Sequence, residues 1–212
     1  MDEKEIKDYL DFVESHKKYY SNSRVKYILD RNELITFESP DGRQLGVKHR
    51  GPYSNMVIDL IQDERGNRLA FERIIPENDG AVVIVTKIDH KYLLLKQYRH
   101  LIGEIQISFP RGCGEKGLSP ENNAKKELSE EVGYHDAKLT FLGTISPDSG
   151  VTSCIVYAYS CQVDEYKIEP GYEDIEGSII LDGVEIDRMI AEGMINDAIS
   201  ISAYTMDRLR QY

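Results

Sequence analysis

The chain has 212 residues, enough for one large domain or two small ones. Its hydrophobic content of 41% allows a sizeable core, which excludes a chain that is disordered throughout. The 26 Lys and Arg residues against 37 Asp and Glu residues give a net charge of −11. This charge argues against a partner that is a nucleic acid or an anionic membrane, because the like charges repel. An anionic ligand would need a few placed basic side chains or a metal ion.

The three cysteines, Cys113, Cys154 and Cys161, form no CxxC pair. An odd number without such a pair is typical of reduced thiols and not of a disulfide framework or a zinc site. The first 20 residues are acidic from residue 2 and contain no apolar h-region, so we expect no signal peptide. No apolar run approaches the ~20 residues of a membrane span. The sequence therefore predicts a soluble cytoplasmic protein.

The first third of the chain predicts a helix and a small antiparallel sheet. Apolar side chains recur at roughly helical spacing in the opening segment, at Ile6, Tyr9, Leu10, Phe12 and Val13. Short β-like runs follow over residues 25–77, with breaks at 30–32 and 40–42 and a hairpin turn at 64–67. Turn-forming residues at 76–80 mark a boundary. We expect one domain over residues 1–78 and another over residues 79–212.

The second domain is predicted to combine strands with helices. Apolar strands over residues 81–88 and 92–100 are joined through residues 89–91, and further strands are expected near residues 139–145 and 154–163. The C-terminal segment predicts two helices interrupted around Gly193. A β-rich core with helices on its faces is an α+β arrangement.

A glycine-rich loop and a helix lie between these strands, over residues 109–134. The glycines Gly112, Gly114 and Gly117 permit sharp turns and a close approach of the backbone to a ligand. Ser119 is a good N-cap with Pro120 at the first helical position, and Gly133 is a good stop signal. The sequence therefore predicts a helix over residues 120–132.

Three carboxylates share one side of this predicted helix. At ~100° per residue Glu127, Glu130 and Glu131 fall in one sector beside an apolar stripe, with Glu131 the innermost. Acids near a helix C-terminus are each disfavoured by ~0.3–1 kcal/mol, and Lys126 can compensate only Glu130. A solvated acidic face is the ordinary interpretation. A divalent cation would reverse these penalties, and oxygen ligands of this kind suit Mg²⁺ or, as a substitute, Mn²⁺.

The segment KELSEEVGY after a glycine-rich loop resembles the signature of the Nudix hydrolases. The resemblance implies a Nudix fold, a mixed sheet flanked by helices. It also implies that Glu127, Glu130 and Glu131 bind metal together with the main-chain carbonyl of Arg111. Gly112, the first glycine of this signature segment (the Nudix box), would lie at the substrate. Two positions depart from the signature. Leu118 replaces the loop glutamate, for which Glu115 is close enough to substitute, and Lys126 replaces an arginine and loses its planar fork.

The wider chain resembles the ADP-ribose pyrophosphatase branch of that family. The resemblance implies that Arg99, in the Gln-Tyr-Arg segment, reaches the substrate phosphates, and that residues 145–154 form the proline-containing loop after the box. The catalytic base would be a glutamate of the acidic loop over residues 171–177, with Glu173 the first choice and Glu176 the second. The branch also implies a homodimer in which the N-terminal domain of one subunit reaches the active site of the other.

Three functions remain open from the sequence. The first is Mg²⁺-dependent hydrolysis of ADP-ribose to AMP and ribose 5-phosphate. The second is the same chemistry on another nucleoside diphosphate sugar, such as a UDP- or GDP-sugar, because the motifs do not encode specificity. The third is a non-catalytic module that binds nucleotide sugars. The departures at Leu118 and Lys126 favour it, and the three intact glutamates argue against it.

Overall fold

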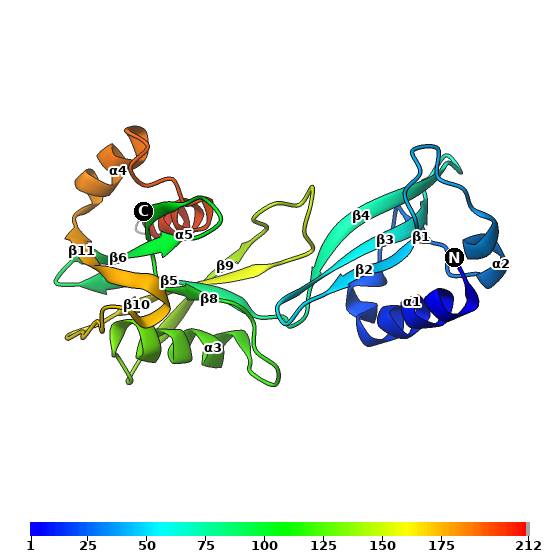
Figure 1. Ribbon diagram of the computed structural model, residues 1–212. Coiled ribbons are helices and arrows are strands. Elements are labelled where there is room, and N and C mark those ends of the chain that lie inside the picture. The colour runs from blue at the N-terminus through cyan, green and yellow to red at the C-terminus, as the bar shows by residue number, and fades with distance from the viewer. Residues whose placement is uncertain (211–212) are drawn as a thin grey trace. The chain divides into compact units, whose positions relative to one another are not determined.

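The computed structural model describes residues 1–210 and divides into two compact units. The first unit comprises Met1–Glu77 and Asp148–Cys154. The second comprises Asn78–Pro147 and the residues from Ile155 onward. Figure 1 labels the elements of both units. None of the helices in the described residues is long and apolar enough to cross a membrane.

The first unit is a four-stranded antiparallel sheet with two α-helices. Its central strand β3 pairs with β1, β2 and β4. In chain order the elements are α1 (Glu3–Ser15), the 3-10 turn η1 (Lys17–Tyr20), β1 (Lys26–Tyr27), α2 (Arg31–Thr36), β2 (Gly46–Arg50), β3 (Ser54–Gln62) and β4 (Arg68–Pro76). The predicted antiparallel N-terminal sheet is thus present.

The opening helix α1 has the amphipathic pattern that the sequence predicts. Asp2 and Glu5 form a capping box, in which each side chain accepts a hydrogen bond from the other's main-chain N–H. The apolar positions Ile6, Tyr9 and Phe12 are buried in the core of the unit. Burial of this stripe and a satisfied N-terminus together explain why the segment is helical.

One predicted strand is a helix. The expected strand between the breaks at 30–32 and 40–42 is replaced by α2, because Asp30 caps this helix by accepting a hydrogen bond from the Glu33 main-chain N–H at 3.0 Å. Leu34 is buried in the core of the unit. A cap and one anchoring side chain therefore outweigh the weak strand pattern.

The segment Asp148–Cys154 belongs to the first unit although it lies far along the chain. It forms an isolated parallel bridge between Thr152 and Ile74 of β4. The Ile74 main-chain N–H donates to the carbonyl of Val151, and the Ser153 N–H donates to the carbonyl of Ile74, both at 2.9 Å. The boundary expected from chain order alone assigned this segment to the second domain.

The second unit is built on a seven-stranded mixed sheet with the order β11-β6-β5-β10-β9, in which β7 also pairs with β6 and β8 with β5. Strands β5 and β10 are parallel, and the other pairs among these strands are antiparallel. The strands are β5 (Ala81–Ile88), β6 (Lys91–Arg99), β7 (Glu104–Ser108), β8 (Arg111–Gly112), β9 (Leu139–Ile145), β10 (Val156–Gln162) and β11 (Ile175–Leu181).

Helices cover both faces of this sheet. The box helix α3 (Pro120–Glu127) and the π-helical turn η2 (Leu128–Val132) lie on one side, and α4 (Gly183–Ala191) and α5 (Ala198–Leu209) lie on the other (Figure 1). A short 3-10 turn, η3 (Tyr172–Asp174), precedes β11. The α+β architecture, the strands near 81–88, 92–100, 139–145 and 154–163 and the two C-terminal helices agree with the sequence. Strands β7, β8 and β11 are not among those predicted.

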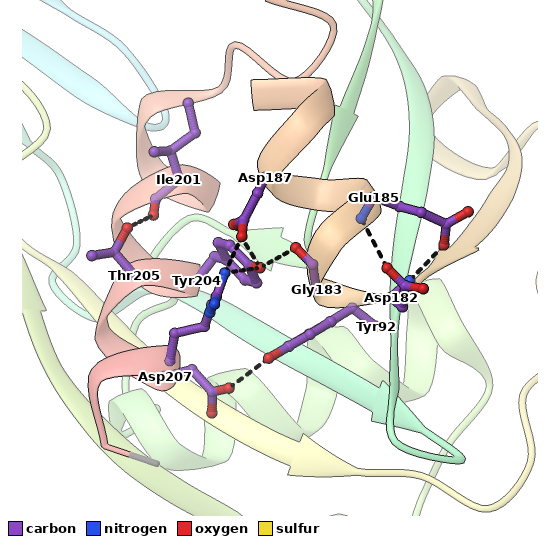
Figure 2. Close-up of polar contacts among 10 residues, drawn as sticks. Tyr92, Asp182, Gly183, Glu185, Asp187, Ile201, Tyr204, Thr205 and Asp207 are labelled. Atoms are coloured by element: carbon purple, nitrogen blue, oxygen red, sulfur yellow. Dashed lines mark hydrogen bonds and ion pairs between the residues drawn. The ribbon is translucent and has the colours of Figure 1, made fainter. Parts of the chain in front are cut away.

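The two C-terminal helices are joined to each other and to the sheet by polar contacts (Figure 2). The Tyr204 hydroxyl of α5 lies 2.9 Å from the carbonyl of Gly183 and 3.0 Å from Asp187, both in α4. The Tyr92 hydroxyl on β6 donates to the Asp207 carboxylate of α5 at 3.4 Å. These contacts fix α5, whose N-terminus contacts the candidate site described below.

The core of the first unit contains a buried ion pair between Asp59 of β3 and Arg73 of β4. Arg73 Nε donates to Asp59 Oδ2 at 2.6 Å, and these side chains are 8% and 0% exposed. Arg73 Nη1 also donates to the carbonyl of Tyr19 and to Ser153 Oγ, and the Tyr9 hydroxyl donates to the other Asp59 oxygen. The pair therefore connects β3 and β4 to α1, η1 and the segment Asp148–Cys154.

Replacing Arg73 by Met is expected to lower the free energy of unfolding by about 3–5 kcal/mol, because it leaves the Asp59 carboxylate buried without its cation. Arg68→Met is a matched control on the same strand, since Arg68 pairs with Glu33 at the same 2.6 Å but both side chains are more than a third exposed. Its expected loss is about 0–1 kcal/mol. Urea unfolding monitored by circular dichroism measures both, and equal losses would contradict this account.

Candidate active site

The glycine-rich loop and its helix begin and end where the sequence predicts. The Ser119 hydroxyl caps α3 by accepting a hydrogen bond from the Asn122 main-chain N–H at 3.2 Å. Gly133 ends the helical segment in the left-handed conformation at φ +71°. Between them the α-helix changes at Leu128 into a π-helical turn. The sequence did not predict this turn, which is a feature often found at functional sites.

The π turn changes which carboxylates lie together. A turn closed by i→i+5 bonds holds more residues than an α turn, so each residue rotates by less than the ~100° used in the sequence prediction. Glu131 is then closer in line with Glu127, and Glu130 is turned further away. Glu127 is 7% and Glu131 2% exposed, whereas Glu130 lies at the surface. The predicted group of three acids is thus a buried pair and one exposed residue.

The buried pair packs against the residues that precede the helix. Glu131 Oε2 accepts a hydrogen bond from the Arg111 main-chain N–H at 3.0 Å. A Cβ atom on Gly112 would lie 1.9 Å from Glu127 Oε1, so the carboxylate occupies the space that any other residue's side chain would fill. The glycine at position 112 is therefore required for the position of Glu127.

Glu130 is held outside the pair by a lysine. Lys126 Nζ lies 2.6 Å from Glu130 Oε2 and 2.8 Å from Glu115 Oε1. Lys126 therefore bridges the two acids, and Glu115 supports the end of the helix from the loop. Within residues 1–210 no three His, Cys, Asp or Glu side chains are gathered as a ready metal-binding cluster.

Burial dominates the electrostatics of the acid pair. It raises the pKa of Glu127 to about 7, against a lowering by the positive charge of Lys126. It raises the pKa of Glu131 to about 8, reinforced by the negative charge of Glu127 and opposed by the hydrogen bond from Arg111. The negative charge of Glu173 raises the pKa of both. Without a cation, the pair therefore holds protons near neutral pH.

Arg99, at the end of β6, lies near these acids and has side-chain donors that make no hydrogen bond within residues 1–210. Its Nε and Nη2 atoms are buried and have no hydrogen-bond partner among the described residues. Burial lowers its pKa, as does the positive charge of Arg111, while Glu131 and Glu173 raise it. Two buried guanidinium nitrogens without an acceptor are unfavourable unless an anion binds them.

A pocket of about 490 Å³ opens beside this guanidinium. The hairpin between β6 and β7, the start of β8 and the turn η3 line it, and the lining residues are Gln97, Tyr98, Arg99, His100, Leu101, Ile102, Gln106, Arg111, Glu173 and Asp174. One part of the lining is charged and another is apolar. Such a pocket suits an anionic ligand that also carries an apolar part.

The two candidate bases differ in their surroundings. Glu173, in the turn η3, lines the pocket and acts electrostatically on Glu127, Glu131 and Arg99. Glu176 is an exposed residue of β11, a strand in a segment for which the sequence predicted only an acidic loop. It falls at a β-bulge, because Ile175 pairs with Gln97 and Gly177 pairs with the next residue, Lys96. The geometry thus favours Glu173.

Two supporting residues were missed by the sequence prediction. Asp197, the N-cap of α5, is buried and forms an ion pair with Arg111 at 3.1 Å, while Ser200 Oγ accepts from the Phe109 main-chain N–H at 2.9 Å. Gln97 is buried on β6 and donates to the carbonyl of Glu173 at 2.7 Å. Gln97 lies two positions after the inward-facing Leu95 on the same strand, so the alternation of side chains indicated that it also faces inward. No local sequence signal indicated that Asp197 pairs with Arg111.

Comparisons with known proteins agree with this architecture. Residues 76–180 match the NUDIX domain family. A crystal structure of an ADP compounds hydrolase superimposes with a TM-score of 0.64 over 76% of this chain and 88% of that chain. The sequence identity in that match is 22%, so the likeness concerns the fold.

Curated relatives match shorter segments. ADP-ribose pyrophosphatase of Bacillus subtilis is 36% identical over 110 residues, which cover 50% of this chain and 60% of the relative. ADP compounds hydrolase NudE of Escherichia coli is 35% identical over 89 residues, covering 42% and 47%. Methanol dehydrogenase activator of Bacillus methanolicus is 30% identical over 116 residues, covering 53% and 63%.

Each alignment thus spans less than two thirds of the relative's own length. The family match over residues 76–180 includes the glycine-rich loop and the helix that carries the acids. The mixed sheet flanked by helices agrees with the superimposed structure. The chain therefore carries a domain of the Nudix family over residues 76–180.

Proposed function

We propose that the protein hydrolyses the pyrophosphate bond of ADP-ribose with the help of Mg²⁺, giving AMP and ribose 5-phosphate. The observation that supports this most directly is the buried pair Glu127 and Glu131 close to the unpartnered donors of Arg99. Two relatives over 30% identical carry the names ADP-ribose pyrophosphatase and ADP compounds hydrolase, which favours an ADP-containing substrate.

The donors of this site fit a hard divalent cation. Glu127 and Glu131 are oxygen ligands whose burial is unfavourable for the charged form unless a cation binds them. With the main-chain carbonyl of Arg111 they would hold Mg²⁺, and Glu130 is the third acid within the same helical turn. A bound Mg²⁺ supplies positive charge against the diphosphate and lowers the pKa of water.

The chain's own residues would perform the remaining tasks. Arg99 would donate from its unpartnered Nε and Nη2 atoms to phosphate oxygens and so replace hydrogen bonds that the substrate loses on leaving water. Glu173 would accept a proton from the attacking water. The water oxygen then bonds to one phosphorus, the bond from that phosphorus to the bridging oxygen breaks, and the bridging oxygen leaves with the second phosphate.

An assay for AMP over a small panel of substrates tests the proposal, with ADP-ribose compared with a UDP-sugar and a GDP-sugar in the presence and absence of Mg²⁺. We expect metal-dependent turnover with ADP-ribose as the best substrate. Preference for another sugar nucleotide would change the assigned substrate but leave the proposed reaction type unchanged. Tight binding of ADP-ribose without turnover would make the protein a non-catalytic module and contradict the proposal.

Variants complete this test. Glu131→Gln is expected to lower kcat by about 100-fold or more, because one buried ligand loses its charge. Glu173→Gln should lower kcat by about 100-fold or more through loss of the base. A larger loss in Glu176→Gln than in Glu173→Gln would move the base to Glu176. Circular dichroism of each variant checks that the fold is kept.

Replacing Arg99 by Leu is expected to raise the KM for ADP-ribose by about 10- to 100-fold, because hydrogen bonds to a charged partner contribute about 1.5–3 kcal/mol. Arg188→Leu is the control, since Arg188 is an exposed arginine of α4 whose nearest acid, Glu192, lies 3.9 Å away. Steady-state kinetics measures both. An unchanged KM in Arg99→Leu would show that this guanidinium does not bind the phosphates.

A further inference from the structure

The turn that carries Glu173 has an unusual backbone. Glu173 and Asp174 both lie in the left-handed region, at φ +46° and φ +60°, although neither is a glycine. This conformation is unfavourable for a residue with a Cβ atom, and two such residues in succession persist only when their surroundings hold them. The Gly171 N–H donates to the carbonyl of Ile175 at 2.8 Å, which closes the turn but contacts neither strained residue.

Gln97 supplies the contact that holds the strained backbone. Its side-chain amide donates from Nε2 to the carbonyl of Glu173 at 2.7 Å. The residue is only 4% exposed, so the amide has little water to exchange this bond for. Gln97 also pairs through its backbone with Ile175 at the β-bulge where β11 begins. One residue of β6 therefore contacts the turn through both its side chain and its main chain.

A second contact from β6 is much weaker. His100 Nε2 lies 3.0 Å from Asp174 Oδ2, but the two side chains are 78% and 56% exposed. Exposed ion pairs contribute little because water and salt screen them. A buried hydrogen bond to a main-chain carbonyl matters more, since breaking it leaves a polar group without a partner. Of the two side-chain contacts from β6, that of Gln97 is therefore the stronger support of the turn.

We propose that Gln97 is a positioning residue, which fixes the main chain of Glu173 so that the Glu173 carboxylate is directed toward Glu127, Glu131 and Arg99. This inference rests on the proposed function, because it assigns a purpose to the position of the base. It predicts that Gln97 affects catalysis only through Glu173. A residue that merely packs in the sheet would instead affect stability and would act independently of Glu173.

The experiment combines kinetics with hydrogen exchange. Gln97→Leu keeps the approximate size of the side chain and removes the donor, and Gln97→Glu keeps its shape and puts an acceptor in its place. Gln162→Leu is the matched control, because Gln162 Nε2 also donates to a main-chain carbonyl, that of Val163 at 3.2 Å, but on β10 and outside the pocket lining. Each variant is also made in the Glu173→Gln background.

We expect both Gln97 variants to lower kcat by about 10- to 100-fold, the effect of a misplaced catalytic group, with KM changed less than about threefold. In the Glu173→Gln background the same substitutions should cause no further loss, because the group that they position is already absent. Gln162→Leu should leave kcat and KM unchanged relative to the parent protein in each background. Equal losses with and without Glu173 would overturn the proposal.

Hydrogen exchange separates this proposal from the proposed function, because it needs no activity. The amides of residues 171–175 should exchange faster in the Gln97 variants than in the wild type, while those of α5 stay unchanged. Unchanged exchange over residues 171–175 overturns the inference about Gln97 whatever the activity. Faster exchange in a protein without pyrophosphatase activity would support the contact and overturn its catalytic purpose together with the proposed function.

Discussion

The burial of two carboxylates beside each other is the constraint on which the rest of the site depends. Glu127 and Glu131 are almost fully removed from water, and the negative charge of Glu127 adds to the cost of charging Glu131. Lys126, the nearest lysine on the helix, is paired with Glu115 and Glu130 instead. Such an arrangement is unfavourable for folding alone, because a fold does not need two adjacent acids in its interior. A site that binds cations and a diphosphate gives the arrangement a purpose.

The surrounding structure holds these groups in place from several directions. Gly112 leaves room for Glu127, and the Arg111 N–H orients Glu131. The Arg111 side chain is in turn paired with Asp197 at the start of α5, and α5 is fixed by its contacts with α4 and β6. The same strand β6 ends in Arg99 and carries Gln97, which contacts the turn of Glu173. One strand therefore carries both the arginine proposed to bind the phosphates and the residue that contacts the turn of the candidate base.

Much of this could be predicted from the sequence, because the signals were local. Ser119, Pro120 and Gly133 fixed the ends of the box helix, and alternating apolar residues marked the main strands. The π turn could not be predicted, since the hydrophobic pattern does not report a change from i→i+4 to i→i+5 bonding. For the same reason the exposed position of Glu130, outside the acid pair, could not be predicted. Helix α2 was mistaken for a strand because Asp30 resembles a turn residue as much as a cap. Asp197 lies 86 residues after Arg111, and only the fold brings them together.

The central claim is that the acid pair is held for a cation, and proton release on metal binding tests it most directly. Because the pKa values of Glu127 and Glu131 are raised to about 7 and about 8, Mg²⁺ must displace protons from the pair at pH 7. Calorimetric titration with Mg²⁺ in buffers of different ionisation enthalpy measures this release. We expect protons to be released at pH 7 but not at pH 9.5, where the pair is already charged, and much weaker Mg²⁺ binding in Glu131→Gln. Binding without proton release at pH 7, or with unchanged affinity in that variant, would contradict the account.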